Sequence, residues 1–150
     1  MFDRETSVGH LTNWAARLFA RVVDRQLKPL GISTGQITIL LSLENGRTSQ
    51  QKALVEQAVV EQSALAATLK RMEKSGLIVR CPDPTDGRAS LFSLTRSGEA
   101  IMDDLHATLE EGNATALAGF DESERLLLVG MLKRIINNIQ TELHDRPVLT

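Results

Sequence analysis

The spacing of apolar residues along the chain predicts mostly helices. Over residues 9–27, apolar side chains recur every three to four positions, as on one face of a helix, before a Pro-Leu-Gly run interrupts the pattern. A second helix, capped by Ser33 or Thr34, is apolar on nearly all sides up to about residue 45. Because such a helix has no face suited to water, we expect it to lie inside the domain.

Two shorter helices are predicted next, in the order of a helix-turn-helix. Thr48 and Gln51 have the spacing of a capping box and open the first helix, which ends near Ala58. After a brief turn, the second helix begins at Gln62, keeps apolar residues on one side and ends before Gly76. Its other side is small, hydrogen-bonding and then cationic, which suits the major groove of DNA.

Extended segments follow these helices. Branched apolar residues predict a strand over residues 77–80, turn formers fill residues 81–88, and residues 89–94 resume an extended pattern. The prediction is a β-hairpin with a long tip. Arg88 lies beside this tip, and we expect Asp86 to hold its guanidinium by charge-assisted hydrogen bonds and leave other donors for DNA.

Two further helices are predicted toward the C-terminal end. Thr95 or Ser97 is expected to cap the first, and Gly98 to allow close packing at its start. The second begins at Asp121, where Glu124 completes a capping box. Both carry apolar stripes, which suit either a dimer interface or an intramolecular bundle.

Five short motifs stand in fixed order in the middle of the chain. They are LVEQA (54–58), EQS (61–63), RMEKSGLI (71–78), DGR (86–88) and LTRSG (94–98). In these motifs and their spacing, the chain resembles the MarR family of bacterial transcriptional regulators. The acidic-x-Arg tip followed by Leu-Thr-x-x-Gly is the most specific part of the resemblance, since a helix-turn-helix by itself is a loose pattern.

The resemblance implies a mainly α fold. This fold is a winged helix-turn-helix, with a three-helix core and a β-hairpin wing, and its N- and C-terminal helices form a dimerisation region. Residues 1–150 would be a single MarR-like domain. Within it, residues 33–98 would be the DNA-binding winged helix part, and residues 5–28 and 99–145 the dimerisation helices.

The function implied is that of a DNA-binding transcription regulator, usually a repressor in this family, that acts as a homodimer. It would bind a pseudo-palindromic operator of double-stranded DNA, with the recognition helix in the major groove and the wing arginine near the minor groove. The candidate DNA-binding residues are Gln62, Ser63, Ala66, Ala67, Thr68, Lys70, Arg71, Asp86 and Arg88.

Two departures from the family pattern limit base reading. Val59 stands where the turn usually has glycine, and Ala66 and Ala67 stand where a polar pair is common. With fewer donors for base edges, we expect a permissive or A/T-leaning site that depends more on phosphates and DNA shape. An alternative function is a winged-helix module that docks on another protein and has lost DNA readout.

Family members commonly bind a small, often aromatic or anionic effector near the junction of the dimer and reading regions. The candidate effector-pocket residues are His10, Trp14, Arg17 and His106, although a tryptophan on a helix, such as Trp14, more often belongs to a core or a dimer interface. A second alternative is a redox-responsive regulator that uses Cys81. Peroxide-sensing members use an N-terminal cysteine with tyrosine partners, whereas this chain has no tyrosine and its cysteine lies at the wing.

Composition and charge agree with a DNA-binding regulator. The 150 residues are 42% hydrophobic, include one cysteine and have a net charge of -2. Residues 1–43 and 44–98 each carry two surplus cations and residues 99–150 carry six surplus acids, so the acidity is kept away from the predicted reading segment. With no signal sequence and no apolar run of about 18 residues, we expect a cytoplasmic protein.

Catalytic motifs are missing from the sequence. It has no glycine-rich phosphate loop, no His-Glu-x-x-His and no paired cysteines, and its three histidines do not stand beside a clear nucleophile. We therefore expect no enzymatic activity, no cofactor and no metal site.

Overall fold

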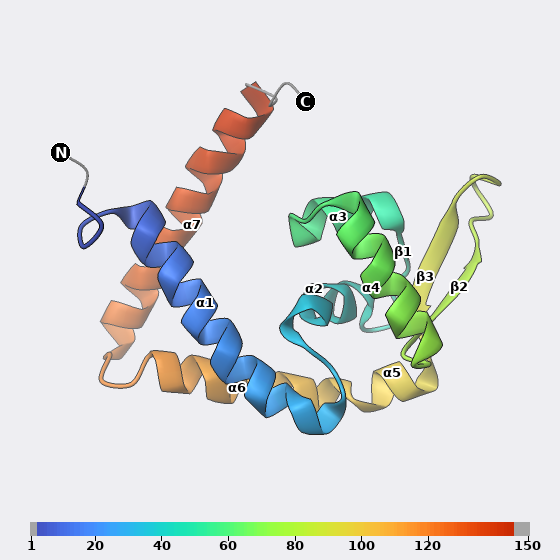
Figure 1. The fold of residues 1–150 in the computed structure, drawn as a ribbon, viewed down its shortest axis with the longest axis horizontal. Coiled ribbons are helices and arrows are strands. Elements are labelled where there is room, and N and C mark those ends of the chain that lie inside the picture. Colours follow the sequence, from blue (N-terminus) through green and yellow to red (C-terminus); the bar gives the residue numbers. More distant parts are fainter. Residues whose placement is uncertain (1–2, 146–150) are drawn as a thin grey trace. The chain divides into compact units, whose positions relative to one another are not determined.

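Helices make up most of the structure, a computed structural model that describes residues 3–145 (Figure 1). The chain forms two units, residues 1–112 and residues 113–150. The prediction of a mainly helical fold with a β-hairpin is confirmed. Of the helices in the described residues, none is long and apolar enough to cross a membrane.

Two helices lead into the core of the first unit. α1 (Val8–Leu27) passes directly into a 3-10 turn (Lys28–Leu30). α2 (Thr34–Leu43) begins with a capping box, in which the Ser33 side chain accepts from the backbone of Gln36 and the Gln36 side chain accepts from the backbone of Ser33. Ser33 is therefore the cap. The helix that follows packs into the core, as predicted, with Ile39, Leu40 and Leu43 buried and most of its other residues half-buried.

The helix-turn-helix consists of α3 (Gln51–Ala58) and α4 (Gln62–Lys74), as the sequence predicts. Gly76 follows the end of α4, and its φ of 75° is favourable for glycine. At this end the backbone N–H of Leu77 donates to the carbonyl oxygen of Met72 at 3.0 Å, which satisfies one of the last helical acceptors.

The prediction that Thr48 caps α3 is wrong. Ser49 and Gln50 form a short strand instead, β1 (Ser49–Gln50), and pair with Phe92 and Leu91. The side chain of Gln50, which directly precedes α3, makes no capping hydrogen bond. Pairing with a distant strand keeps the backbone extended up to the helix, and a strand of two residues leaves no periodic signal in the sequence.

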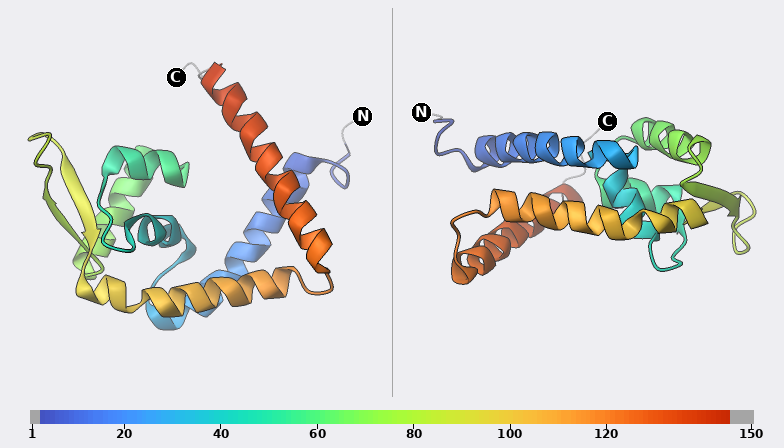
Figure 2. Two further views of the ribbon diagram at one scale, coloured as in Figure 1. Left: turned by 180° about the vertical axis from the view of Figure 1, so that it is seen from behind. Right: turned by 90° about the horizontal axis from the view of Figure 1, so that it is seen from below.

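β2 (Ile78–Pro82) and β3 (Ser90–Leu94) form the predicted hairpin, with Arg80 opposite Phe92. β1 joins them in an antiparallel sheet of order β1-β3-β2. The first hairpin strand extends to Pro82, two residues beyond the prediction. The hairpin projects past the helices at one end of the first unit (Figures 1 and 2).

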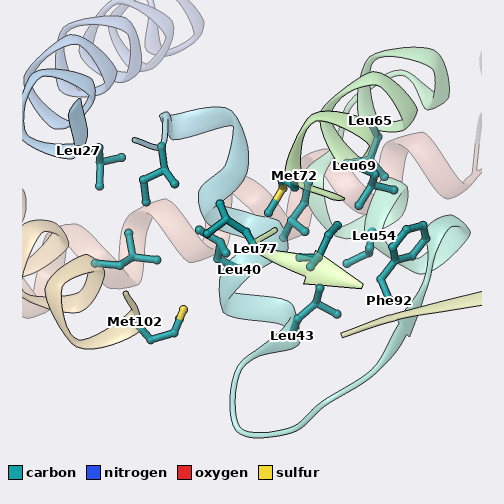
Figure 3. Packing of buried hydrophobic residues seen from close by; sticks show 14 of the residues in the cluster. Leu27, Leu40, Leu43, Leu54, Leu65, Leu69, Met72, Leu77, Phe92 and Met102 are labelled. Carbon is teal, nitrogen blue, oxygen red and sulfur yellow. The ribbon is translucent and has the colours of Figure 1, made fainter. Parts of the chain in front are cut away.

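One apolar core holds together the helix-turn-helix, the wing and the flanking helices of the first unit (Figure 3). Contributions come from α1 to α4, from β2 and β3 and from α6 (Met102–Ala116). The largest fully buried side chains are Val23, Leu27, Ile39, Leu40, Leu43, Leu54, Leu65, Leu69, Met72, Phe92 and Leu105. This shared burial places α4 against the sheet.

α5 (Arg96–Ala100) begins with the cap and the close packing that the sequence predicts. The Thr95 side chain accepts a hydrogen bond from the Gly98 N–H at 3.1 Å, and its hydroxyl donates to the carbonyl oxygen of Gly76. A Cβ atom added to Gly98 would overlap the carbonyl oxygen of Leu77. The end of the wing is thus joined to the end of α4.

α7 (Glu122–Asp145) is the main element of the second unit. Its predicted capping box is confirmed, because the Asp121 N–H donates to Glu124 and the Glu124 N–H donates to Asp121, each at 2.9 Å. Hydrogen bonds from the Ser123 hydroxyl and the Glu124 N–H lower the pKa of Asp121. Eight large apolar side chains of α7 are exposed: Leu126, Leu127, Val129, Met131, Leu132, Ile136, Ile139 and Leu143.

Candidate DNA-binding surface

α4 has one buried face and one exposed face. Leu65, Leu69 and Met72 recur at helical spacing and are buried in the core. Their burial turns the other side of the helix toward solvent. Most of the predicted recognition residues are exposed there, and Ala66 and Thr68 are half-buried. The exposed ones are Gln62, Ser63, Ala67, Lys70 and Arg71.

Thr68 and Arg71 interact on this face. The Thr68 hydroxyl donates to the carbonyl oxygen of Ala64 at 3.0 Å and accepts from Nη2 of Arg71 at 3.0 Å. The hydroxyl proton is therefore engaged within the helix, and the contact takes one of the five N–H donors of the guanidinium. Thr68 orients Arg71 rather than supplying a donor of its own.

The prediction that Asp86 holds the Arg88 guanidinium is wrong. Oδ1 of Asp86 accepts a hydrogen bond from the Arg88 backbone N–H at 3.0 Å, and the Asp86 carbonyl oxygen accepts from the Ala89 N–H at 2.9 Å. An Asp side chain that bonds its own backbone two residues on closes a turn, and this local bond outcompetes the side-chain pair. The Arg88 side chain is exposed at the wing tip.

Asp83 is a wing residue that sequence reasoning missed. It is only 5% exposed, and its carboxylate accepts from the Thr85 hydroxyl at 2.7 Å, from the Thr85 N–H at 2.8 Å and from the Gln50 side chain. These hydrogen bonds, led by that of the Thr85 hydroxyl, lower the pKa of Asp83. The Asp-Pro-Thr order is a turn signal, but the partner Gln50 is 33 positions away.

The start of α4 and the wing border the same groove. Gln62 of α4 and Arg88 of the wing both lie along it, with Arg80 and with Lys52 at the start of α3. Three of the four charged residues in this groove are cations, and the fourth is Glu56. A mostly cationic groove beside a recognition helix suits the phosphate backbone of DNA.

The turn between α3 and α4 is strained at Val59. Its φ of 51° and ψ of 47° are left-handed, a conformation that glycine adopts easily and a β-branched residue does not. The family pattern, which usually has glycine here, thus has a backbone reason. The Val59 side chain is 80% exposed and supplies no buried contact in compensation.

Three of the four predicted effector residues lie together. His10, Trp14 and Arg17 line an open pocket of about 600 Å³ along the first half of α1, and the rings of His10 and Trp14 are 6.1 Å apart. The fourth residue, His106, lies on α6 with its Nε2 2.8 Å from the Glu44 carboxylate. The structure therefore separates His106 from the other three.

Cys81 is exposed on β2. Its Sγ lies 3.7 Å from the carbonyl oxygen of Leu91 on the neighbouring strand. This position matches a strand residue of the wing, and a redox role for Cys81 stays a prediction.

These features together define a class of protein. A helix-turn-helix whose second helix exposes hydrogen-bonding and cationic residues, followed by a β-hairpin with an arginine at its tip, is a winged helix-turn-helix of the DNA-binding type.

Comparison with known proteins shows which family the chain resembles. Residues 30–89 match the model of the MarR family. The HTH-type transcriptional repressor NicR of Pseudomonas putida is 23% identical over 137 residues, which cover 91% of this chain and 87% of NicR. These matches support a DNA-binding transcriptional regulator of the MarR family.

Solved structures of regulators have the same fold. A mutant of MarR from E. coli, crystallised in complex with operator DNA, has a TM-score of 0.81 at 25% identity, over 90% of this chain and 97% of that one. BpsR of Bordetella bronchiseptica, whose DNA binding is regulated by 6-hydroxynicotinic acid, also has a TM-score of 0.81, at 20% identity over 90% and 96%.

Proposed function

We propose that the protein is a homodimeric transcriptional repressor that binds a pseudo-palindromic operator of double-stranded DNA. One observation carries the proposal: Gln62 at the start of α4 and Arg88 at the wing tip border one mostly cationic groove. A duplex contacted by the exposed face of α4 in its major groove would bring Arg88 near the adjacent minor groove. The similarity to an operator-bound MarR supports this mode of binding.

The dimer in this proposal is built by the apolar face of α7. Leu132, Ile136 and Ile139 are exposed and recur at helical spacing. A second copy of the chain would cover this face and gain the hydrophobic free energy of its burial. A twofold dimer would then read two half-sites about 34 to 36 Å apart, one turn of DNA.

Release from DNA by a small aromatic anion completes the proposed function. The pocket on α1 is lined by the ring of Trp14, by the cations Arg4 and Arg17 and by one acid, Glu5, so its surplus of positive charge suits an aromatic carboxylate. The regulation of BpsR by 6-hydroxynicotinic acid supports this class of ligand. A ligand that favours a dimer with mis-spaced reading heads would lower the affinity for the operator.

A fluorescently labelled duplex from upstream of the protein's own gene tests operator binding. Anisotropy titrations at two salt concentrations, beside a scrambled duplex, should show tight binding to the native duplex only, and this binding should survive the higher salt. Equal and salt-sensitive binding to both duplexes, or none, would instead favour the alternative of a winged-helix module that docks on another protein.

The substitution Arg88→Ala separates these two functions. For a DNA-binding wing it should weaken operator binding and reduce the salt slope by about one phosphate contact's worth. Arg134→Ala removes an exposed arginine from α7 as the matched control and should leave both quantities unchanged. A protein-docking module predicts no effect of either substitution.

The ligand pocket is tested with 6-hydroxynicotinic acid as the probe. Added to the operator complex, it should lower the anisotropy of the labelled duplex. Trp14→Ala should reduce this response without weakening operator binding in the absence of the acid, because Trp14 lies on α1 and not along the groove that Gln62 and Arg88 border. A response that is the same in both proteins would place the ligand elsewhere.

A further inference from the structure

Arg80 joins the wing to the recognition helix. It lies on β2, and its guanidinium donates from Nε to one Glu73 carboxylate oxygen at 3.1 Å and from Nη2 to the other at 2.7 Å. Glu73 is the last residue but one of α4. Two parallel hydrogen bonds of this kind fix orientation as well as distance, which a single contact does not.

The same guanidinium lies over an aromatic ring. The Arg80 carbon Cζ is 5.1 Å from the ring centre of Phe92, its cross-strand partner on β3. Phe92 is only 1% exposed and belongs to the core shared by α4 and the sheet. Arg80 therefore contacts a carboxylate from the helix and a ring that is buried in the core.

This contact connects the two parts of the molecule that the proposed function brings to DNA. Arg80 borders the same groove as Gln62 and Arg88. Gln62 lies at one end of α4 and Glu73 near the other, so the ion pair links the wing strand to the end of the recognition helix away from Gln62. Arg88 follows that strand at the tip of the wing.

We propose that Arg80, through its paired hydrogen bonds to Glu73 and its contact with Phe92, is a positioning residue that holds the wing at the angle at which Arg88 and α4 engage DNA together. The inference rests on the proposed function. It assigns to Glu73, an acid beside a DNA-binding surface, the task of holding Arg80 rather than any contact with DNA.

Because Glu73 is negatively charged, the proposal can be tested by whether its replacement weakens or strengthens operator binding. Removal of a negative charge beside bound DNA normally strengthens binding, because it reduces repulsion of the phosphates. If Glu73 acts through Arg80, Glu73→Gln should instead weaken operator binding, by about two- to fivefold, the range expected for loss of one partly exposed ion pair. The side-chain exposures are 49% for Arg80 and 27% for Glu73.

The first experiment measures operator affinity by anisotropy for the full chain and for Glu73→Gln. Glu56→Gln is the matched control, since Glu56 borders the groove but makes no ion pair with Arg80. The control should bind as tightly as the wild type or more tightly. Arg80→Lys, which keeps the charge but loses the paired geometry, should weaken binding as Glu73→Gln does. Circular dichroism establishes that each variant is folded.

Two further readouts separate positioning from a general loss of stability. In the Glu73→Gln background, Arg88→Ala should cost less affinity than in the wild type, because the wing is already misplaced. Hydroxyl-radical footprints should lose protection at the flanks, where the wing lies, and keep it at the major-groove centres of the half-sites. A double variant that exchanges the two residues, Glu73→Arg with Arg80→Glu, should recover part of the operator affinity that either single substitution loses.

The outcomes distinguish the two proposals. Specific binding by the wild type that Glu73→Gln leaves unchanged or tightens would overturn the positioning role alone. It would also be overturned if Arg88→Ala reduced operator affinity as much in the Glu73→Gln background as in the wild type. Absence of specific binding by the wild type to any duplex from its own genome would overturn the proposed function, and this inference with it.

Discussion

Val59 shows how one residue can be at odds with the backbone that its neighbours require. The turn of the helix-turn-helix needs a left-handed residue, and valine in that conformation costs about 1 to 2 kcal/mol. The side chain is 80% exposed, so little packing is lost when it is removed. Val59→Gly should therefore raise the free energy of unfolding by about 1 kcal/mol, a gain partly reduced by the greater freedom of glycine in the unfolded chain.

Urea denaturation measures this change. Val60→Gly is the control, because Val60 is the next residue, is also exposed and has no left-handed conformation. It should lower the free energy of unfolding slightly. Equal effects of the two substitutions would show that the backbone of Val59 is not strained.

Gly98 represents the opposite case, a residue that the fold requires. A Cβ atom at this position would overlap the Leu77 carbonyl oxygen, which accepts the Thr95 N–H. Gly98→Ala should lower the free energy of unfolding by about 3 kcal/mol, since the backbone must shift to relieve the overlap. Gly9→Ala, a helical position with open space around it, should be neutral or slightly stabilising. Thermal denaturation of both variants checks the difference, and equal melting temperatures would contradict it.

At the scale of elements, the wing depends on a polar anchor. Asp83 joins the loop between β2 and β3 to Gln50, the residue that links β1 and α3. Hydrogen bonds that favour the charged carboxylate lower its pKa in the folded state. The stability that Asp83 supplies is therefore fully present above its unfolded pKa, near 3.8, and is lost as the pH falls through the lower folded value.

Asp83→Asn should accordingly speed amide hydrogen exchange in the wing at neutral pH. The difference in stability between the wild type and the variant should shrink as the pH falls below about 4, because the wild-type carboxyl becomes neutral as well. Asp104→Asn, at an exposed position on α6, is the control and should leave wing exchange unchanged. A difference that persists undiminished at low pH would show that the charge of Asp83 is not what anchors the wing.

At the scale of the whole molecule, the proposed function assigns the dimer interface to the apolar face of α7. The proposed dimer buries Ile136, and an acid at that position would place an unpaired charge in the interface. Ile136→Glu should therefore shift the protein from dimer to monomer in sedimentation velocity at micromolar concentration. Asn138→Glu adds the same charge about 200° away around the helix and should leave the dimer intact. A monomeric wild type would contradict the proposed assembly.

The acidic and basic residues are also distributed unevenly over the whole molecule. The surplus of acids lies beyond residue 98, while the segment with the helix-turn-helix and the wing carries surplus cations. The cations of the groove are Lys52 of α3, Arg80 of β2 and Arg88 of the loop between β2 and β3. The charge balance of the segment was predictable from its sequence, but the gathering of these three residues was not.

The sequence by itself determined the features that depend on near neighbours. The capping boxes of Ser33 with Gln36 and Asp121 with Glu124, the cap at Thr95 and the end of α4 before Gly76 involve residues at most five positions apart. Helical periodicity likewise separated the buried and exposed faces of α4. The order of elements, the fold class and the candidate reading helix followed from these signals.

Only the tertiary structure decided which distant residues meet. The strand β1, the anchor from Asp83 to Gln50 and the pair of Arg80 with Glu73 arise where the shared core brings separate elements together. The same core placed His106 beside Glu44 and away from the residues on α1. The free energies of these interactions come from contacts between elements that pack together, and no local pattern along the chain shows which distant residues will meet.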